Sequence, residues 1–169
     1  MKRAVNASIS IAATAIVVAT AFACSQTEQL VQSRGRANEA GAIATLRTVL
    51  SAEAAYAASN GGGYGSIECL SNPKPCSPAD PGQAYLDKGF VSGARNGYEF
   101  EFFAGSAAPG GGSGPSGSKL SSFAVVASPA AEDSPNRRFC GDSSMNVCAL
   151  EDDDEPDGGA CPATCKPLQ

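Results

Sequence analysis

The cysteines constrain the fold of this chain more than any other feature. Seven are present in 169 residues, and six of them lie in three close pairs along the sequence, Cys69 with Cys76, Cys140 with Cys148 and Cys161 with Cys165. Such spacing in a short chain is typical of a small domain held by disulfides, which persist in an oxidising compartment. We therefore predict an exported domain with three disulfides. Short spacing favours closure within each pair, although six cysteines permit many other pairings.

The seventh cysteine, Cys24, directly follows an apolar stretch, residues 9–23, whose end Ala21-Phe22-Ala23 fits a signal-peptidase site. The stretch is intermediate in length between a signal peptide's hydrophobic region and a membrane-spanning helix. Three interpretations are open: cleavage after Ala23, acylation of Cys24 as in a bacterial lipoprotein, or retention of residues 1–23 as a hydrophobic stem. Acylation of Cys24 is favoured because it removes the unpaired thiol.

The composition excludes several classes of function. The chain has no histidine, so it holds no Ser-His-Asp or Cys-His catalytic pair. No other general base is recognisably paired with a nucleophile, and we expect neither enzymatic activity nor a cofactor. The net charge is −5, and lysine and arginine are not clustered, so we expect no nucleic-acid partner.

Residues 26–59 predict one long helix, because residue types that favour helices dominate them. The sequence Asn60-Gly61-Gly62-Gly63 is a typical helix end. Glu53 falls within the apolar face, and we expect its carboxylate to accept backbone N–H bonds from the following loop. The apolar face itself recurs at helical spacing and consists of Ala42, Ile43, Leu46, Val49, Leu50, Tyr56 and Ala57.

The remaining pattern predicts strands joined by loops. Residues 98–104 and 122–128 read as two strands, and residues 138–140 and 146–149 read as a terminal hairpin. The sequence therefore predicts an α+β fold in which a long helix packs on a small antiparallel sheet of three to four strands. The connecting loops are residues 61–96, anchored by Tyr85-Leu86 and Phe90-Val91, and the Gly/Ser/Pro-rich residues 105–118, which we expect to be mobile.

Several short segments occur in a suggestive order. The first half of the chain contains Leu30-Val31-Gln32-Ser33-Arg34, Ala37-Asn38-Glu39-Ala40, Leu46-Arg47-Thr48-Val49 and Ala52-Glu53-Ala54-Ala55-Tyr56, followed by Gly63-Tyr64. The second half contains Gly97-Tyr98-Glu99-Phe100, Phe123–Pro129 and Arg137-Arg138-Phe139. In order and spacing, these segments resemble type IV pilins and type II secretion pseudopilins over most of residues 30–148.

The resemblance implies a pilin-like domain over residues 24–149, with helix 26–59, loop 61–96 and sheet 97–149. It also implies contact with the membrane and with other pilin-like subunits. Two positions depart from the family, since Asn6 stands at the place of the glycine before the prepilin cleavage site and Ile11 at the place of the glutamate of the stem. Fibre assembly is therefore not implied.

Residues 150–169 are expected to be an acidic, cysteine-containing tail. The run from Glu151 to Asp157 invites a calcium site, because calcium prefers oxygen ligands and the pseudopilins that the chain resembles include calcium binders. The candidate ligands are Asp153 and Asp157, but Thr164 stands where an EF-hand loop needs its closing glutamate. A solvated tail is the favoured interpretation.

These observations predict an envelope-anchored or exported structural pilin-like subunit, located in the periplasm or at the membrane of a bacterial cell. One alternative is a true minor pseudopilin of a type II secretion or type IV pilus machine. The other is a secreted module that binds calcium or a protein.

Overall fold

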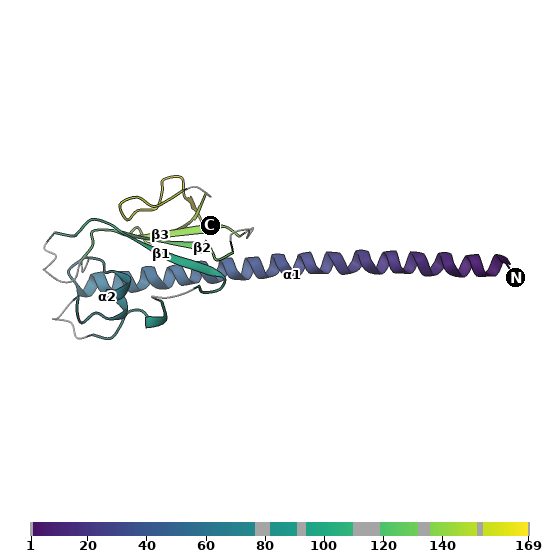
Figure 1. Cartoon of the computed structure of the whole chain (residues 1–169). Helices are drawn as coiled ribbons and strands as arrows, with labels where there is room; N and C mark the ends of the chain where they lie inside the picture. The colour runs from purple at the N-terminus through teal and green to yellow at the C-terminus, as the bar shows by residue number, and fades with distance from the viewer. Residues whose placement is uncertain are drawn as a thin grey trace. The chain divides into compact units, whose positions relative to one another are not determined.

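The structure is a computed structural model that describes residues 2–76, 82–90, 94–109, 119–131, 136–151 and 154–168, with side chains from residue 29 onward. It comprises two units, Met1–Ala37 and Asn38–Gln169, and each is described by itself. The first unit is helical, and among its described side chains Leu30 and Val31 are exposed. The second unit holds the end of the same helix and the sheet (Figure 1).

Helix α1 runs from Lys2 to Ser59, so it ends where the sequence predicts and begins well before residue 26. The backbone N–H of Gly62 donates to the carbonyl of Ala57 at 2.8 Å. Gly61 and Gly62 have φ angles of 70° and 88°, which glycine adopts at little cost. This is the glycine helix end that the sequence indicates.

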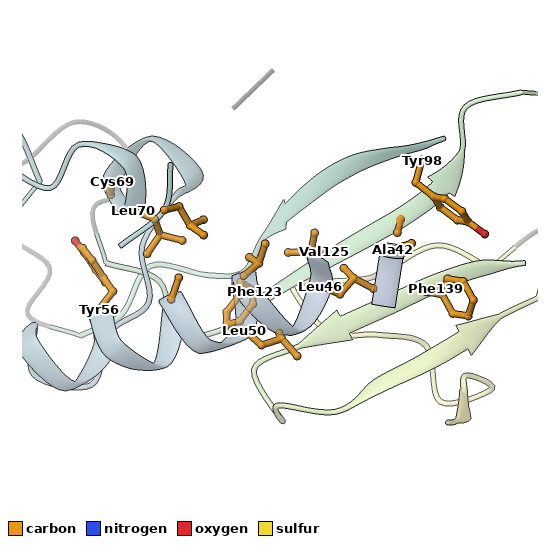
Figure 2. Packing of buried hydrophobic residues seen from close by; sticks show 14 residues of the cluster. Ala42, Leu46, Leu50, Tyr56, Cys69, Leu70, Tyr98, Phe123, Val125 and Phe139 are labelled. Carbon is orange, nitrogen blue, oxygen red and sulfur yellow. The ribbon is translucent and has the colours of Figure 1, made fainter. Parts of the chain in front are cut away.

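One face of α1 in the second unit forms the core together with the sheet (Figure 2). The predicted face is confirmed with small changes, since Ile43 and Ala57 are half-buried and Ala52 joins the buried set. Leu46 and Tyr56 are fully buried, and apolar burial of this kind stabilises the fold by roughly 25 cal/mol per Å². The buried side chains of this face are Ala42, Leu46, Val49, Leu50, Ala52, Glu53 and Tyr56.

Within the described residues, the sheet is antiparallel and has five strands in the order β1-β2-β3-β4-β5. This corrects the expected count of three to four, and it leaves the α+β class of the prediction in place. The additional strand comes from the end of the chain, where the sequence carries no strand pattern. The bounds are β1 Tyr98–Ala104, β2 Phe123–Pro129, β3 Arg138–Asp142, β4 Val147–Leu150 and β5 Lys166–Pro167.

The two faces of the sheet bury different sets of side chains. In β2, Phe123, Val125 and Ala127 belong to the core on the α1 side. Ala124 and Val126 alternate with them and belong to a second apolar cluster on the opposite face. Both faces of β2 are therefore covered, which explains why this strand reads as a continuous apolar run.

The described part of the loop between α1 and β1 contains two short helices, α2 (Ile67–Ser71) and η1 (Lys88–Phe90). Cys69 and Cys76 form a disulfide, as the sequence predicts. The anchor role of Tyr85-Leu86 is also confirmed, because both backbone N–H groups donate to the carbonyl of Leu70 and the Tyr85 ring meets the Tyr56 ring edge-on at 5.6 Å.

Part of the segment expected to be mobile is hydrogen-bonded. Gly105 donates its N–H to the carbonyl of Ser122, and Ala108 donates to that of Lys119. Residues 105–108 thus extend the pairing of β1 with β2 beyond the strands. Residues 110–118 of the expected mobile loop lie outside the described residues.

The other two predicted disulfides are wrong. Cys140 bonds Cys161, and Cys148 bonds Cys165. The reason is the direction of the side chains, because Cys140 and Cys148 are buried in the cluster on the sheet face opposite α1. The C-terminal segment, residues 154–168, crosses this face (yellow in Figure 1) and supplies both partners. The described residues of the expected tail are therefore tied to the sheet.

Candidate functional site

Glu53 is the most unusual ionisable group among the described residues. It lies on the buried face of α1 and has no exposed surface. Its Oε2 accepts the backbone N–H of Gly65 at 2.9 Å, which confirms the expected bond to the following loop. Its Oε1 is buried without a hydrogen-bond partner in the described part of the chain.

This environment favours the neutral carboxyl group. Burial raises the pKa of Glu53 to about 8, and the bond from Gly65 acts in the opposite direction. A buried charge without a second partner is costly, so at neutral pH the group holds a proton. Gly65 also lies close to the side chain of Tyr56 in α1, because a Cβ added to Gly65 would be 3.1 Å from the Tyr56 ring. Glu53 therefore fastens the end of α1 to the loop.

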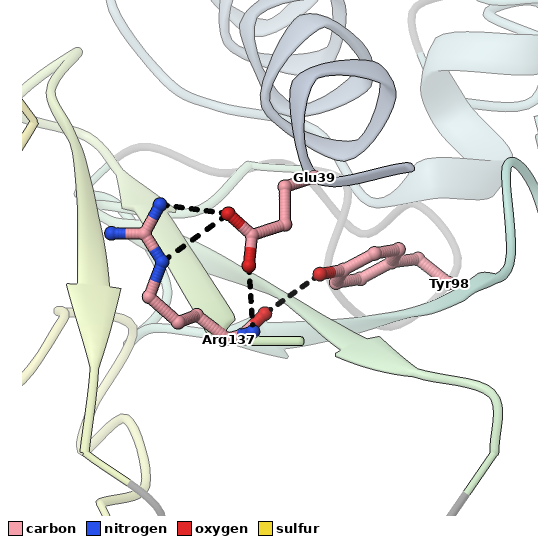
Figure 3. Close-up of polar contacts among 3 residues, drawn as sticks. All are labelled: Glu39, Tyr98 and Arg137. Carbon is pink, nitrogen blue, oxygen red and sulfur yellow. Dashed lines mark hydrogen bonds and ion pairs between the residues drawn. The ribbon is translucent and has the colours of Figure 1, made fainter. Parts of the chain in front are cut away.

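A second polar site connects α1 to the sheet (Figure 3). The Arg137 guanidinium binds Glu39 through Nη2 at 2.7 Å and Nε at 3.3 Å, and the backbone N–H of Arg137 donates to the other carboxylate oxygen at 3.1 Å. The Tyr98 hydroxyl donates to the carbonyl of Arg137 at 2.9 Å. Burial raises the pKa of Tyr98 to about 12, and the nearby Glu39 carboxylate adds to this shift while Arg137 opposes it.

Glu39 and Arg137 occur in separate family-like segments of the sequence, which give no sign that the two residues pair. They are 98 positions apart, and helix position 39 meets the start of β3 only when the sheet is assembled. No local pattern could have signalled the pair. It is a structural contact, because Glu39 and the Tyr98 hydroxyl bind backbone groups of Arg137 and the Arg137 guanidinium binds Glu39. Arg137 also borders a pocket of about 480 Å³, whose other lining residues are Ala40, Ile43, Arg47, Pro167 and Leu168.

Polar contacts reinforce the attachment of the C-terminal segment to the sheet. Arg138 donates to the carbonyl of Asp154 and to the carboxylate of Glu155, both at 3.2 Å. Asp142 accepts the backbone N–H of Cys161 at 2.9 Å. Lys166 in β5 binds Glu151. Part of the acidic run is therefore paired with basic side chains of the domain.

The predicted calcium and lipidation residues have different outcomes. Asp157 is exposed, whereas Asp153 lies outside the described residues. Among the residues that the structure describes, no three His, Cys, Asp or Glu side chains are grouped so as to hold a metal ion. The side chain of Cys24 also lies outside the described part. Within the described residues, no helix is long and apolar enough to cross a membrane.

A groove of about 260 Å³ opens beside strand β1. Its walls come from α2, η1 and β1, and its floor comes from α1 and β2. Two exposed carboxylate residues, Glu68 and Glu101, also border it. Its apolar lining consists of Val49, Ile67, Phe90, Phe100, Phe102 and Val125. The sequence signals nothing at this place, because the groove forms between elements that are distant in the chain.

Comparison of the chain with protein-family models, with curated proteins and with solved structures gave no match.

Proposed function

We propose that this chain is an exported structural subunit of the bacterial envelope, pilin-like in fold, held at the membrane by its N-terminal region and without catalytic activity. The observation that carries the proposal is the burial of one face of α1 against a small antiparallel sheet. That arrangement, with Leu46 and Tyr56 of the helix fully buried, is what a resemblance to pilins implies.

The polar sites support a structural role. Glu53 fastens the helix end to Gly65, and Glu39 fastens the helix to Arg137 at the start of β3. One oxygen of Glu53 accepts a backbone N–H, and both oxygens of Glu39 are bonded to Arg137. An enzyme needs an activated group directed at a substrate, and these groups are directed at the chain itself.

The disulfides support the proposed location. Three disulfides indicate an oxidising environment outside the cytosol. Because the other six cysteines form these disulfides, Cys24 is the cysteine that remains for acylation. A single acyl chain gives only marginal anchoring, and bacterial lipoproteins carry several chains that hold firmly.

The experiment is fractionation of bacterial cells that produce the full chain or its Cys24→Ala variant. We expect the unaltered protein in the membrane fraction and the variant either in the soluble envelope fraction or blocked in maturation. The matched control is Ser25→Ala, which changes the neighbouring residue and should stay in the membrane fraction. A Cys24→Ala protein that matures and fractionates as the unaltered chain does would overturn the lipid anchor.

The same experiment separates the main alternative. If Cys24→Ala remains in the membrane with the mass of the uncleaved chain, as the unaltered protein does, then residues 9–23 are the anchor. A minor pseudopilin with a retained stem would then replace the lipoprotein, despite Asn6 and Ile11 at the two departing positions.

A further inference from the structure

Strand β1 is the first strand of the sheet and pairs along one side with β2. At the start of β1, the backbone N–H of Arg95 donates to the carbonyl of Tyr98 at 2.7 Å, and the N–H of Tyr98 donates to the carbonyl of Arg95 at 2.9 Å. The two residues between them, Asn96 and Gly97, have φ angles of 53° and 74°, which is the geometry of a tight type I′ turn. The backbone polar groups of Tyr98 therefore point away from β2.

This fixes the direction of the polar groups further along the strand. In an antiparallel pair, successive residues point their N–H and C=O alternately toward and away from the neighbouring strand. Phe100 and Phe102 have the same parity as Tyr98, so their polar groups point toward the free edge. Glu99 and Glu101 point theirs at Ser128 and Val126 of β2.

The four outward-pointing groups of Phe100 and Phe102 have no hydrogen-bond partner in the described part of the chain. Proteins usually cover or pair such an edge, because an open row of N–H and C=O groups is a template for another strand. Here the edge borders the groove beside β1, which is lined by the half-buried rings of Phe90, Phe100 and Phe102.

Apolar and acidic side chains alternate along this edge. Phe100 and Phe102 face the groove, whereas the side chains of Glu99 and Glu101 alternate with them and are exposed, although Glu101 also borders the groove. Glu68 adds a third carboxylate residue on the α2 wall. The Arg95 guanidinium lies over the ring of Phe90, which lines the groove, 4.3 Å from the ring centroid.

We propose that the free edge of β1 and the adjoining groove bind an extended peptide segment whose side chains alternate between apolar and basic, so that the peptide adds a strand to the sheet. The backbone of the peptide pairs with Phe100 and Phe102. Its apolar side chains enter the groove, and its basic side chains lie opposite Glu99 and Glu101. This binding surface goes beyond the proposed structural role and does not depend on how the N-terminus is anchored.

The charges favour this partner over pairing between the β1 edges of two copies. Two copies joined edge to edge bring the carboxylates of Glu99 and Glu101 of one chain next to those of the other. Like charges directly opposite each other on neighbouring strands are destabilising. A basic strand replaces that repulsion with attraction.

The probe is an acetylated, amidated hexapeptide of alternating valine and lysine, added to the full chain. We expect saturable binding, measured by fluorescence anisotropy of the labelled peptide. At a peptide concentration ten times the Kd, hydrogen exchange of the Phe100 and Phe102 amides should slow about tenfold. The amide of Glu101 already bonds to β2 and should show little change.

Charge reversal gives the matched comparison. Glu101→Lys should raise the Kd tenfold or more, and Glu99→Lys provides a second variant on the same face. Asp157→Lys makes the same change in charge at an exposed position of the C-terminal segment and should leave the Kd within twofold. Circular dichroism checks that all three variants are folded.

Four outcomes would overturn the proposal. The first is absence of saturable binding, and the second is equal binding of a valine–glutamate hexapeptide. The third is equal weakening by Asp157→Lys, which would show that only net charge matters. The fourth is protection of the Phe100 and Phe102 amides that rises with protein concentration when no peptide is present, because the edge would then pair with a second copy.

Discussion

Cys140 and Cys148 are directly opposite each other in strands β3 and β4, yet each forms its disulfide with the C-terminal segment instead of with the other. Cys140 reaches Cys161 and Cys148 reaches Cys165. The two disulfides thus hold residues 154–168 over the face of the sheet that α1 does not cover.

This connectivity predicts the stability of disulfide variants. Replacing Cys148 and Cys165 together by alanine should lower the free energy of unfolding by about 3 kcal/mol, because the bond closes a long loop in the unfolded chain. Urea denaturation without reductant measures the loss. Peptide mapping without reductant should recover Cys140 linked to Cys161, and recovery of a Cys140–Cys148 peptide would contradict the attachment.

Glu53 predicts a specific dependence of stability on pH. The folded protein holds this proton more tightly than the unfolded chain, because the folded pKa is about 8 and the ordinary value is 4.5. The stabilisation is complete below pH 4.5 and is lost as the pH rises toward 8. The loss is on the order of a few kcal/mol, at about 1.4 kcal/mol per pKa unit. Urea denaturation at pH 5, 7 and 9 measures it.

The variant that isolates this effect is Glu53→Gln, which resembles the protonated carboxyl group and does not ionise. Its stability should match that of the unaltered protein at pH 5 and exceed it at pH 9. Glu99→Gln removes an exposed carboxylate and should leave the pH dependence nearly unchanged. A parallel pH dependence for Glu53→Gln and the unaltered protein would show that Glu53 is already ionised in the fold.

Two adjacent glycines test how closely the C-terminal segment lies against the end of β1. A Cβ added to Gly159 would be 2.6 Å from the backbone nitrogen of Gly105, whereas a Cβ added to Gly158 would meet nothing within 4 Å. Both have positive φ angles, so each alanine variant has a backbone cost of roughly 1–2 kcal/mol. Gly159→Ala should cost about 1–3 kcal/mol more than Gly158→Ala in thermal unfolding. Equal losses would mean that the segment lies farther from Gly105.

The contact between Glu39 and Arg137 predicts a measurable coupling in a double-mutant cycle with Glu39→Ala and Arg137→Ala. We expect about 0.5–1 kcal/mol, because two guanidinium nitrogens bond one carboxylate oxygen but the Arg137 side chain is 57% exposed. The coupling should decrease in high salt. The more exposed pair of Lys166 and Glu151 provides the comparison and should show a smaller coupling. A Glu39–Arg137 coupling of zero would remove this link between α1 and the sheet.

Local patterns were sufficient to predict much of the fold. The end of α1, its buried face and the bounds of β1 follow from periodicity and from glycine at the helix end. The bond from Gly65 to Glu53 also follows, because a carboxylate on an apolar face needs a nearby donor. These features depend on residues close together in the sequence.

Most of the errors concern contacts between distant segments. Strand β5 has only two residues, and it exists because the disulfides bring Lys166–Pro167 alongside β4. Short spacing misled the pairing of Cys140 with Cys148, since sequence distance does not show that both side chains face the C-terminal segment. The groove beside β1 also requires the assembled tertiary structure, because its lining comes from α1, α2, η1, β1 and β2.

The measurement that tests the central claim most directly is the mass of the N-terminal peptide of the protein purified from bacterial membranes. An envelope-anchored lipoprotein with this pilin-like domain predicts a mature chain that begins at Cys24 and carries acyl chains on that residue. A chain that begins at Cys24 without acyl chains, recovered from the soluble fraction, would contradict membrane anchoring and leave a secreted domain. A chain that retains residues 1–23 would contradict the lipid anchor and assign that role to the hydrophobic stem.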